Sequence, residues 1–278
     1  MGNGVASRNG EQSGAGRRPR GSASTPRIAL ISDIHGNFEA LKALPRDYDE
    51  LWVLGDLVNY GPQPAEVIEF VSKNASVVVR GNHDDAVAFD RDPRCSLAFR
   101  EAAEETRRFT ASVLKNEHKD YLADLPHYRW VRRGRWTFYN CHAVPSDPLH
   151  AYCGEDHRAR WRKELATAGS DFLCVGHTHL RFVIHEGGQF VVNPGSIGQP
   201  KSGSPEASYA IWENGLITLR KYEYPVEKTV ARIRAMPVSA RSQRSSGLLR
   251  TPDKAASRAA GLSGGTKTPA VPSARTAL

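Results

Sequence analysis

Ile28-Ala-Leu-Ile-Ser-Asp-Ile-His-Gly-Asn37 is a short apolar run that ends in an aspartate and a histidine two residues apart. The aliphatic residues at its start are typical of a central strand covered on both faces. Side chains at positions i and i+2 of an extended chain point to the same side, so Asp33 and His35 can converge on one point. Because open α/β sheets bind ligands at the carboxyl ends of their strands, the stretch predicts a buried strand leading into a ligand-carrying loop. Taken alone, such a pair is more often a helix cap and a surface histidine than a pair of metal ligands.

Two further apolar segments end in polar side chains in the same way. The first ends in Gly55-Asp56, and the second, 75–79, leads into Arg80-Gly-Asn-His-Asp84. Segments with helical spacing, 37–44 and 63–71, lie between these strands. Three strand–helix repeats predict a βαβ arrangement with a mostly parallel sheet.

The second half of the chain delivers further histidines from predicted strands. A β-hairpin over 128–141 ends directly before His142, and a buried strand at 171–175 ends in Gly176-His-Thr-His179. Helices are predicted between these elements, and short alternating segments after residue 180 predict antiparallel hairpins that form a second sheet. The predicted helices are 95–125 and 155–168, and the predicted late strands are 182–185, 190–192, 207–212 and 216–222.

The formal net charge of +8 invites a nucleic-acid interpretation, but the excess charge lies at the ends of the chain. Residues 1–26 and 237–278 together hold 11 basic and 2 acidic residues, whereas 27–236 hold 27 and 28. Both ends are rich in Gly, Ser and Arg without periodic apolar residues, which predicts disordered basic tails. The sequence therefore predicts one folded domain over 27–236 and no stable nucleic-acid complex, with a surface tether as the alternative use of the tails.

The four cysteines show no C-x-x-C pairing, and no apolar run resembles a signal peptide or a membrane span. We therefore expect reduced thiols and a cytoplasmic location.

The predicted strand ends together offer two carboxylates, one amide and five imidazoles. Imidazoles combined with oxygen ligands suit manganese, iron, cobalt, nickel or zinc rather than calcium or magnesium. The set is too large for one tetrahedral zinc and sufficient for two ions that share a carboxylate, each with an open position for water. A structural metal site is the alternative, but such sites are closed and usually rich in cysteine. The residues are Asp33, His35, Asp56, Asn82, His83, His142, His177 and His179.

The order of these motifs resembles the calcineurin-like metallophosphoesterase superfamily. The resemblance rests on D-x-H-G-N at 33–37, G-D at 55–56, G-N-H-D at 81–84, the single His142, and G-H-T-H at 176–179, and it spans roughly residues 27–222. The segments 142–148 and 192–200 resemble the small bacterial and archaeal phosphodiesterase branch. The resemblance implies an α/β fold, a four-layer αββα sandwich of two mixed β-sheets flanked by helices.

The same resemblance implies roles for individual residues. It places Asp33, His35 and His179 on a first metal ion, and Asn82, His142 and His177 on a second, with Asp56 as the bridge. The implied cofactors are two divalent transition metal ions, manganese first, with nickel, cobalt, iron or zinc as alternatives. One departure is Ala143, because the branch usually has glycine after this histidine.

Three more residues receive implied roles near the substrate. His83 would face the leaving group and, as an imidazolium, donate a proton to the departing oxygen or stabilise charge there. Asp84 would orient the His83 ring. Asn37 would contact a phosphate oxygen, or else only cap the helix that follows it.

The leading hypothesis is a phosphodiesterase that hydrolyses its substrate by in-line attack of a metal-bridging hydroxide. The substrate would be a phosphoester, with nucleotides among the candidates. A serine/threonine protein phosphatase or a dinucleoside polyphosphate hydrolase is the alternative, but those relatives show G-D-x-V-D-R-G and G-N-H-E, where this chain has Asn59-Tyr60-Gly61 and Asp84. The third hypothesis is a scaffold of the same fold without turnover.

Overall fold

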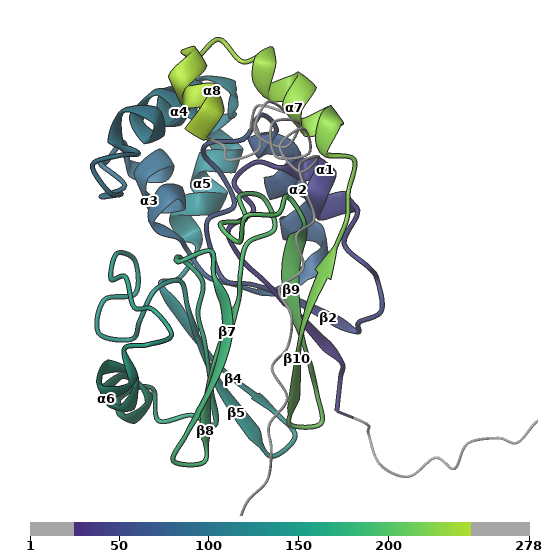
Figure 1. Cartoon of the computed structure of the whole chain (residues 1–278), viewed down its shortest axis with the longest axis vertical. Coiled ribbons are helices and arrows are strands. Elements are labelled where there is room, and N and C mark those ends of the chain that lie inside the picture. The colour runs from purple at the N-terminus through teal and green to yellow at the C-terminus, as the bar shows by residue number, and fades with distance from the viewer. Residues whose placement is uncertain (1–24, 246–278) are drawn as a thin grey trace, which may run out of the picture.

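Two five-stranded sheets face one another in the computed structural model, which describes residues 25–245 (Figure 1). The first sheet has the order β10-β9-β1-β2-β3. Strands β1, β2 and β3 run parallel to one another, whereas β9 is antiparallel to β1 and β10 is antiparallel to β9. The strands are β1 Ile28–Ile31, β2 Glu50–Val53, β3 Ala75–Val78, β9 Ala207–Glu213 and β10 Leu216–Tyr222.

The second sheet has the order β4-β5-β6-β8-β7. Its inner strands β5, β6 and β8 are parallel, whereas the edge strands β4 and β7 run antiparallel to them. The strands are β4 Tyr128–Arg133, β5 Trp136–Cys141, β6 Phe172–Cys174, β7 Arg181–Glu186 and β8 Gln189–Pro194. Both sheets are thus mixed, as predicted.

The interior between the sheets is aromatic. Phe172 stacks on Phe138 and on Phe190, with ring centroids 5.0 and 5.1 Å apart, and the Trp212 ring meets Phe138 edge-on. The alternation of a strand explains how both faces of the first sheet are buried. Ile28 and Leu30 of β1 face the second sheet, while the residues between and after them pack under helices.

Helices cover the outer face of each sheet (Figure 1). Helix α6 packs on the second sheet, where Trp161 and Leu165 are buried against β6 and β8. The remaining helices lie beyond the first sheet and its carboxyl end. They are α1 Phe38–Lys42, α2 Pro64–Asn74, α3 Asn82–Phe89, α4 Arg100–Val113, α5 Asn116–Asp124, α7 Val226–Arg234 and α8 Ala240–Ser245, and α6 is Arg158–Ala168. The four-layer sandwich is therefore confirmed.

The prediction that all four late strands form the second sheet is wrong for one hairpin. Strands β9 and β10 join the first sheet, with Ile28 of β1 paired to Trp212 of β9. Strand β2 pairs with only one edge of β1, so the backbone groups on the other edge need a partner, which β9 supplies. Hydrophobic alternation predicts a strand and its buried face, but it does not select which sheet edge the strand joins.

Two predicted boundaries also differ from the structure. The helical stretch predicted over 95–125 is two helices separated at Leu114, where the chain is extended. Helix α8 lies inside the stretch predicted as a C-terminal tail, and it is held to α4 because Ser239 donates to Glu105 and Arg241 pairs with Glu101. Short polar helices of this kind lack apolar periodicity, so their order comes from tertiary contacts. The rest of both predicted tails, 1–24 and 246–278, lies outside the described residues.

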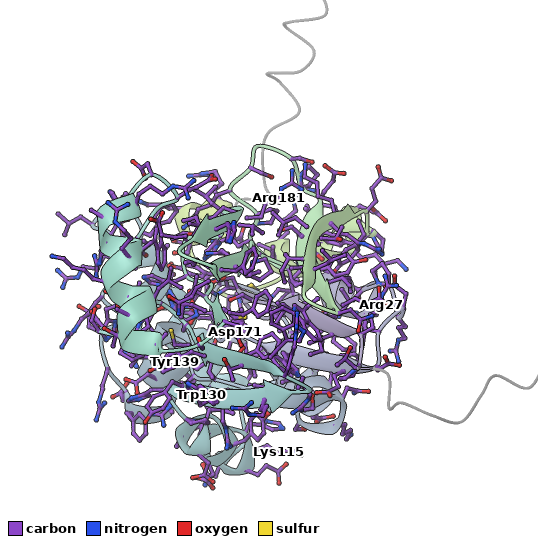
Figure 2. All side chains as sticks on the ribbon, turned by 90° about the horizontal axis from the view of Figure 1, so that it is seen from below. Arg27, Lys115, Trp130, Tyr139, Asp171 and Arg181 are labelled. Atoms are coloured by element: carbon purple, nitrogen blue, oxygen red, sulfur yellow. The ribbon has the colours of Figure 1, made fainter. Side chains whose placement is uncertain are left out.

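Figure 2 looks at the end of the sandwich where the parallel strands begin, with Arg27 directly before β1 and Asp171 directly before β6. The carboxyl ends of those strands lie at the opposite end. Within residues 25–245, no helix has both the length and the apolar character needed to cross a membrane.

Candidate metal centre

Loops that follow the parallel strands meet at the carboxyl ends of the two sheets. Backbone hydrogen bonds tie them together: the N–H of Asp33 donates to Gly55, and the N–H of Gly176 donates to His142. These contacts bring all seven predicted metal ligands into one buried cluster, in which none of the seven is more than 6% exposed. The cluster consists of Asp33, His35, Asp56, Asn82, His142, His177 and His179.

The first group of ligand atoms comes from the ends of β1 and β6. His179 Nε2 lies 3.3 Å from Asp33 Oδ1 and 3.2 Å from His35 Nε2. Ligand atoms that share one ion at about 2.1 Å lie about 3.0–3.4 Å apart. Two of the three separations fall in that range, and the third, between His35 Nε2 and Asp33 Oδ1, is 3.9 Å. The three side chains are therefore close enough together to be candidate ligands of a single ion.

The second group comes from the ends of β2, β3, β5 and β6. His142 Nε2 lies 3.2 Å from Asp56 Oδ2, 3.1 Å from Asn82 Oδ1 and 3.1 Å from His177 Nδ1. Asp56 also reaches the first group, because its Oδ2 is 3.7 Å from His35 Nε2. The Asp56 carboxylate thus lies between two candidate metal sites.

The outer nitrogen of each candidate imidazole ligand faces a backbone carbonyl. His142 Nδ1 lies 2.8 Å from the Leu54 oxygen, and His179 Nδ1 lies 2.7 Å from the Gln199 oxygen. His35 and His177 have the same arrangement, with Val58 and His150 respectively. Since a carbonyl only accepts, the outer nitrogen carries a proton, and in a neutral ring the inner nitrogen presents its lone pair to the cluster.

Burial and mutual charge set the protonation of this cluster. Burial raises the pKa of Asp33 to about 7 and lowers the pKa of His35 to about 3. For Asp56, burial raises the pKa, but the charge of His142 and other imidazoles holds it well below the usual value. For His142, burial lowers the pKa, but Asp56 raises it to about 9 overall. Asp56 and His142 are therefore a charge pair in the protein alone, and a bound cation would replace the His142 proton.

The chemistry of the donors fits a pair of transition metal ions. Asp33 Oδ1 is buried and has no hydrogen-bond partner, although it faces two imidazole nitrogens. A buried carboxylate oxygen without a partner is unfavourable unless a cation completes its surroundings. The imidazoles, amide and carboxylates match the ligand preference of manganese, iron, cobalt, nickel and zinc.

Backbone strain is concentrated in the same loops. Asp33, His35 and Asp56 have φ angles of 54°, 46° and 55°, and His177 and His179 have 65° and 60°. The left-handed region is unfavourable for residues with a side chain, and it persists where the surroundings determine it fully. The fold therefore holds these side chains at a conformational cost, as is typical of functional sites.

His83 lies beside the cluster and lines a cavity of about 180 Å³ together with Asp56, Tyr60 and Tyr152. Its backbone N–H donates to Asp56 Oδ1 at the start of α3. Burial lowers the pKa of His83 to about 4, although Asp56 opposes this. The structure places His83 in the wall of a cavity beside the ligand cluster, and its predicted role at a leaving group stays a prediction.

The predicted role of Asp84 differs from what the structure shows. Asp84 does not contact the His83 ring; Oδ1 accepts from the N–H groups of Leu57 and Val58, and Oδ2 accepts from Gly81. The carboxylate therefore binds the loop after β2 to the start of α3. The motif G-N-H-D reveals that two polar residues are adjacent, but the helical start at Asn82 turns their side chains in different directions.

Replacing Asp84 with alanine is expected to lower the free energy of unfolding by roughly 3 kcal/mol or more, because three buried N–H groups lose their acceptor. Urea unfolding followed by circular dichroism measures this change. Asp120→Ala, on the exposed face of α5, is the matched control and should change stability by less than about 0.5 kcal/mol. Equal effects of the two substitutions would contradict the bracing role of Asp84.

Asn37 is a helix cap in this structure. Its Oδ1 accepts from the N–H of Ala40 and from the Thr229 hydroxyl, and its Nδ2 donates to Gly198 and Tyr224. Both polar atoms of the side chain are engaged and buried, so the structure favours the capping alternative over the predicted contact with phosphate.

Several cavity residues escaped the sequence analysis. Tyr60, Phe99, Tyr152 and Lys201 line the same cavity as His83, and Tyr152 lies against His177 with ring centroids 4.0 Å apart. Lys201 Nζ lies 5.8 Å from the centre of the Phe99 ring. These residues come from four separate loops with no shared motif. Asn59, which lies three residues after Asp56, also received no role from the sequence, and only the structure places it on His83.

A four-layer α/β sandwich that gathers these side chains at one edge defines the metallophosphoesterase class of fold. The chain belongs to the calcineurin-like phosphoesterase superfamily, whose domain model matches residues 27–214. Among similar proteins, one from Methanocaldococcus jannaschii is 32% identical over 231 residues, which cover 74% of this chain and 91% of that protein. Phosphodiesterase YfcE of Escherichia coli is 26% identical over 208 residues, covering 69% and 90%.

Solved structures agree with this assignment. A metallophosphoesterase from Sphaerobacter thermophilus matches with a TM-score of 0.68 and 31% identity, covering 81% of this chain and 99% of that one. A protein from Pyrococcus horikoshii matches with a TM-score of 0.70 at 23% identity, covering 78% and 96%, which shows the shared fold.

Proposed function

We propose that this protein is a dimetal-dependent phosphodiesterase. In this proposal Asp33, His35 and His179 hold one ion, Asn82, His142 and His177 hold the other, and Asp56 bridges them. The observation that supports it most strongly is the position of the Asp56 carboxylate between two buried ligand groups.

The two ions would lower the pKa of a bound water and neutralise charge on the phosphoryl group. Manganese is the first candidate, and nickel, cobalt, iron and zinc suit the same imidazole and oxygen donors. The protein itself supplies a cavity in which His83 and Lys201 provide hydrogen-bond donors and Tyr60, Phe99 and Tyr152 provide aromatic walls.

The charge around the cavity favours a diester over a monoester. Tyr60 occupies the position where the related phosphatases carry an arginine, and the cation in the cavity wall is Lys201. A monoester carries up to two negative charges and benefits from a guanidinium that binds two oxygens. A diester carries one charge, so it needs less compensation.

Metal removal gives a direct test of this function. Protein treated with a chelator is expected to lose hydrolysis of bis(p-nitrophenyl) phosphate, and manganese, nickel or cobalt should restore it, since the ions supply most of the charge stabilisation. Activity on p-nitrophenyl phosphate, measured in parallel, should be lower. A strong preference for the monoester would support the phosphatase alternative. Tight binding of two ions without turnover of either ester would support a scaffold.

Dinucleoside polyphosphate hydrolysis is the second candidate function. A symmetrical bis(5'-nucleosyl)-tetraphosphatase from Psychromonas ingrahamii is 38% identical over 63 residues, which cover 20% of this chain. Diadenosine tetraphosphate offered beside the diester decides between them, because the two substrates differ in the number of phosphates that the cavity must bind.

We also propose a cytoplasmic location, since all four cysteines are free.

A further inference from the structure

Asn59 follows β2 in a left-handed conformation, with φ at 73°, and lies fully buried between His83 and helix α4. Its Nδ2 is 2.7 Å from His83 Nδ1. Asn59 thus links His83, which is proposed to face the leaving group, with helix α4, which lies outside the metal-binding loops.

Two backbone groups fix which way the Asn59 amide points. The Tyr60 N–H donates to Asn59 Oδ1 over 2.9 Å, and Asn59 Nδ2 donates to the Ala103 carbonyl over 3.2 Å. A flipped amide would place N–H against N–H at Tyr60 and oxygen against oxygen at Ala103. The observed orientation is therefore the one that both backbone partners allow.

The second hydrogen of the Asn59 amide then points at His83 Nδ1, which must accept it. We infer that Asn59 is a positioning residue that holds His83 in the tautomer with its proton on Nε2. Because Nδ1 faces Asn59, Nε2 is the ring nitrogen left to the cavity that His83 lines. His83 thus offers the substrate a neutral N–H donor instead of a transferable imidazolium proton. This inference rests on the proposed function and deepens it.

Helix α4 supports the same arrangement. The Thr106 hydroxyl lies 2.6 Å from Asn59 Oδ1 and 2.7 Å from the Ala102 carbonyl. Asn59 and Thr106 are both fully buried, so no solvent competes for these groups. Helix α4 therefore contributes to the chemistry at His83 in addition to covering the sheet.

This donor changes how the leaving group departs. The water oxygen forms a bond to phosphorus and gives up a proton to solvent, while the bond from phosphorus to the leaving oxygen breaks. The leaving oxygen keeps the electron pair, accepts a hydrogen bond from His83 Nε2–H and takes its proton from solvent. Esters whose leaving oxygen is weakly basic, such as aryl or phosphoanhydride groups, are then the preferred substrate class over alkyl esters.

A single isosteric substitution reverses the direction of the hydrogen bond. In Asn59→Asp a carboxylate accepts from Nδ1–H and favours the imidazolium, which is a general acid. With manganese-loaded protein and a series of substituted phenyl diesters, kcat of the wild type should fall steeply as the leaving phenol becomes more basic. In Asn59→Asp the rate on the most basic phenol, relative to the least basic, should rise at least about tenfold. An unchanged ratio would overturn the inference.

Thr106→Val is the matched control inside the same network. It removes the hydroxyl but leaves the amide held by Tyr60 and Ala103, so kcat can fall while the dependence on the leaving group stays that of the wild type. A shift of that dependence equal to the one in Asn59→Asp would show that general disturbance of the cavity causes it, and would count against the inference.

A spectroscopic measurement keeps the inference testable without turnover. Long-range ¹H–¹⁵N correlation on zinc-loaded wild-type protein distinguishes protonated from unprotonated ring nitrogens, and His83→Gln assigns the signals. At neutral pH, His83 should show a protonated Nε2 and an unprotonated Nδ1. A proton on Nδ1 would refute the inference. The expected tautomer in a protein that hydrolyses no ester would refute the proposed function alone.

Discussion

Replacing Asp56 with asparagine is expected to lower kcat for diester hydrolysis by on the order of a thousandfold. Asp56 Oδ2 lies 3.7 Å from His35 Nε2 and 3.2 Å from His142 Nε2, so one carboxylate serves both candidate sites. Asparagine keeps the shape but removes the negative charge that both ions would share. Steady-state rates with added manganese, and metal content per chain by mass spectrometry, measure the two consequences.

A control for the loss of one carboxylate is Glu117→Gln. Glu117 lies on the exposed face of α5 and pairs with Lys115, far from the metal-binding loops in the sequence. It should keep the wild-type rate and metal content. If Asp56→Asn binds two ions as tightly as the wild type and retains more than about a tenth of its rate, then Asp56 does not bridge them.

Gly81→Ala is expected to have the second-largest effect. A Cβ atom on Gly81 would overlap Oδ1 and the backbone nitrogen of Asp56, so the added methyl must push the carboxylate of this proposed bridging residue away. A displacement of about 1 Å in a catalytic group costs on the order of a hundredfold in rate. Overpacking should also lower the free energy of unfolding by roughly 1–3 kcal/mol. Rates on the diester and urea unfolding report the two effects.

The Gly81 backbone is in the ordinary extended region, with φ at −92°, so the predicted effect is steric and does not come from backbone strain. Gly154→Ala is the appropriate comparison. There the added Cβ meets only the far end of the flexible Asp156 side chain, which can move. If the two variants retain similar activity, the close approach of Gly81 to Asp56 has no functional consequence.

The substitutions Asp56→Asn and Gly81→Ala test different properties of the site. Asp56→Asn changes a proposed ligand without changing the packing, whereas Gly81→Ala changes the packing without removing a ligand. Loss of activity in both would show that the centre depends on donor chemistry and on the close contact of the loops that carry the donors.

The sequence by itself determined the candidate ligands and the strand–helix repeats that carry them, and its resemblance to a known family implied the layered architecture. An apolar segment that ends in Asp33, Asp56 or His142 reports both the strand and the side chain at its end, because strand burial and strand termination are local properties. The carboxyl ends of parallel strands share one edge, so side chains 144 residues apart, such as His35 and His179, could be predicted to meet.

The tertiary structure alone decided which polar groups serve the chemistry from outside those motifs. It placed β9 in the first sheet and directed the Asp84 carboxylate to backbone N–H groups instead of the His83 ring. It also brought Asn59 and Thr106 together across 47 residues. The physical reason is that a hydrogen bond needs two groups within about 3 Å in a set direction. Local periodicity fixes the face on which a side chain lies, but only the packing of loops and helices selects the partner it meets there.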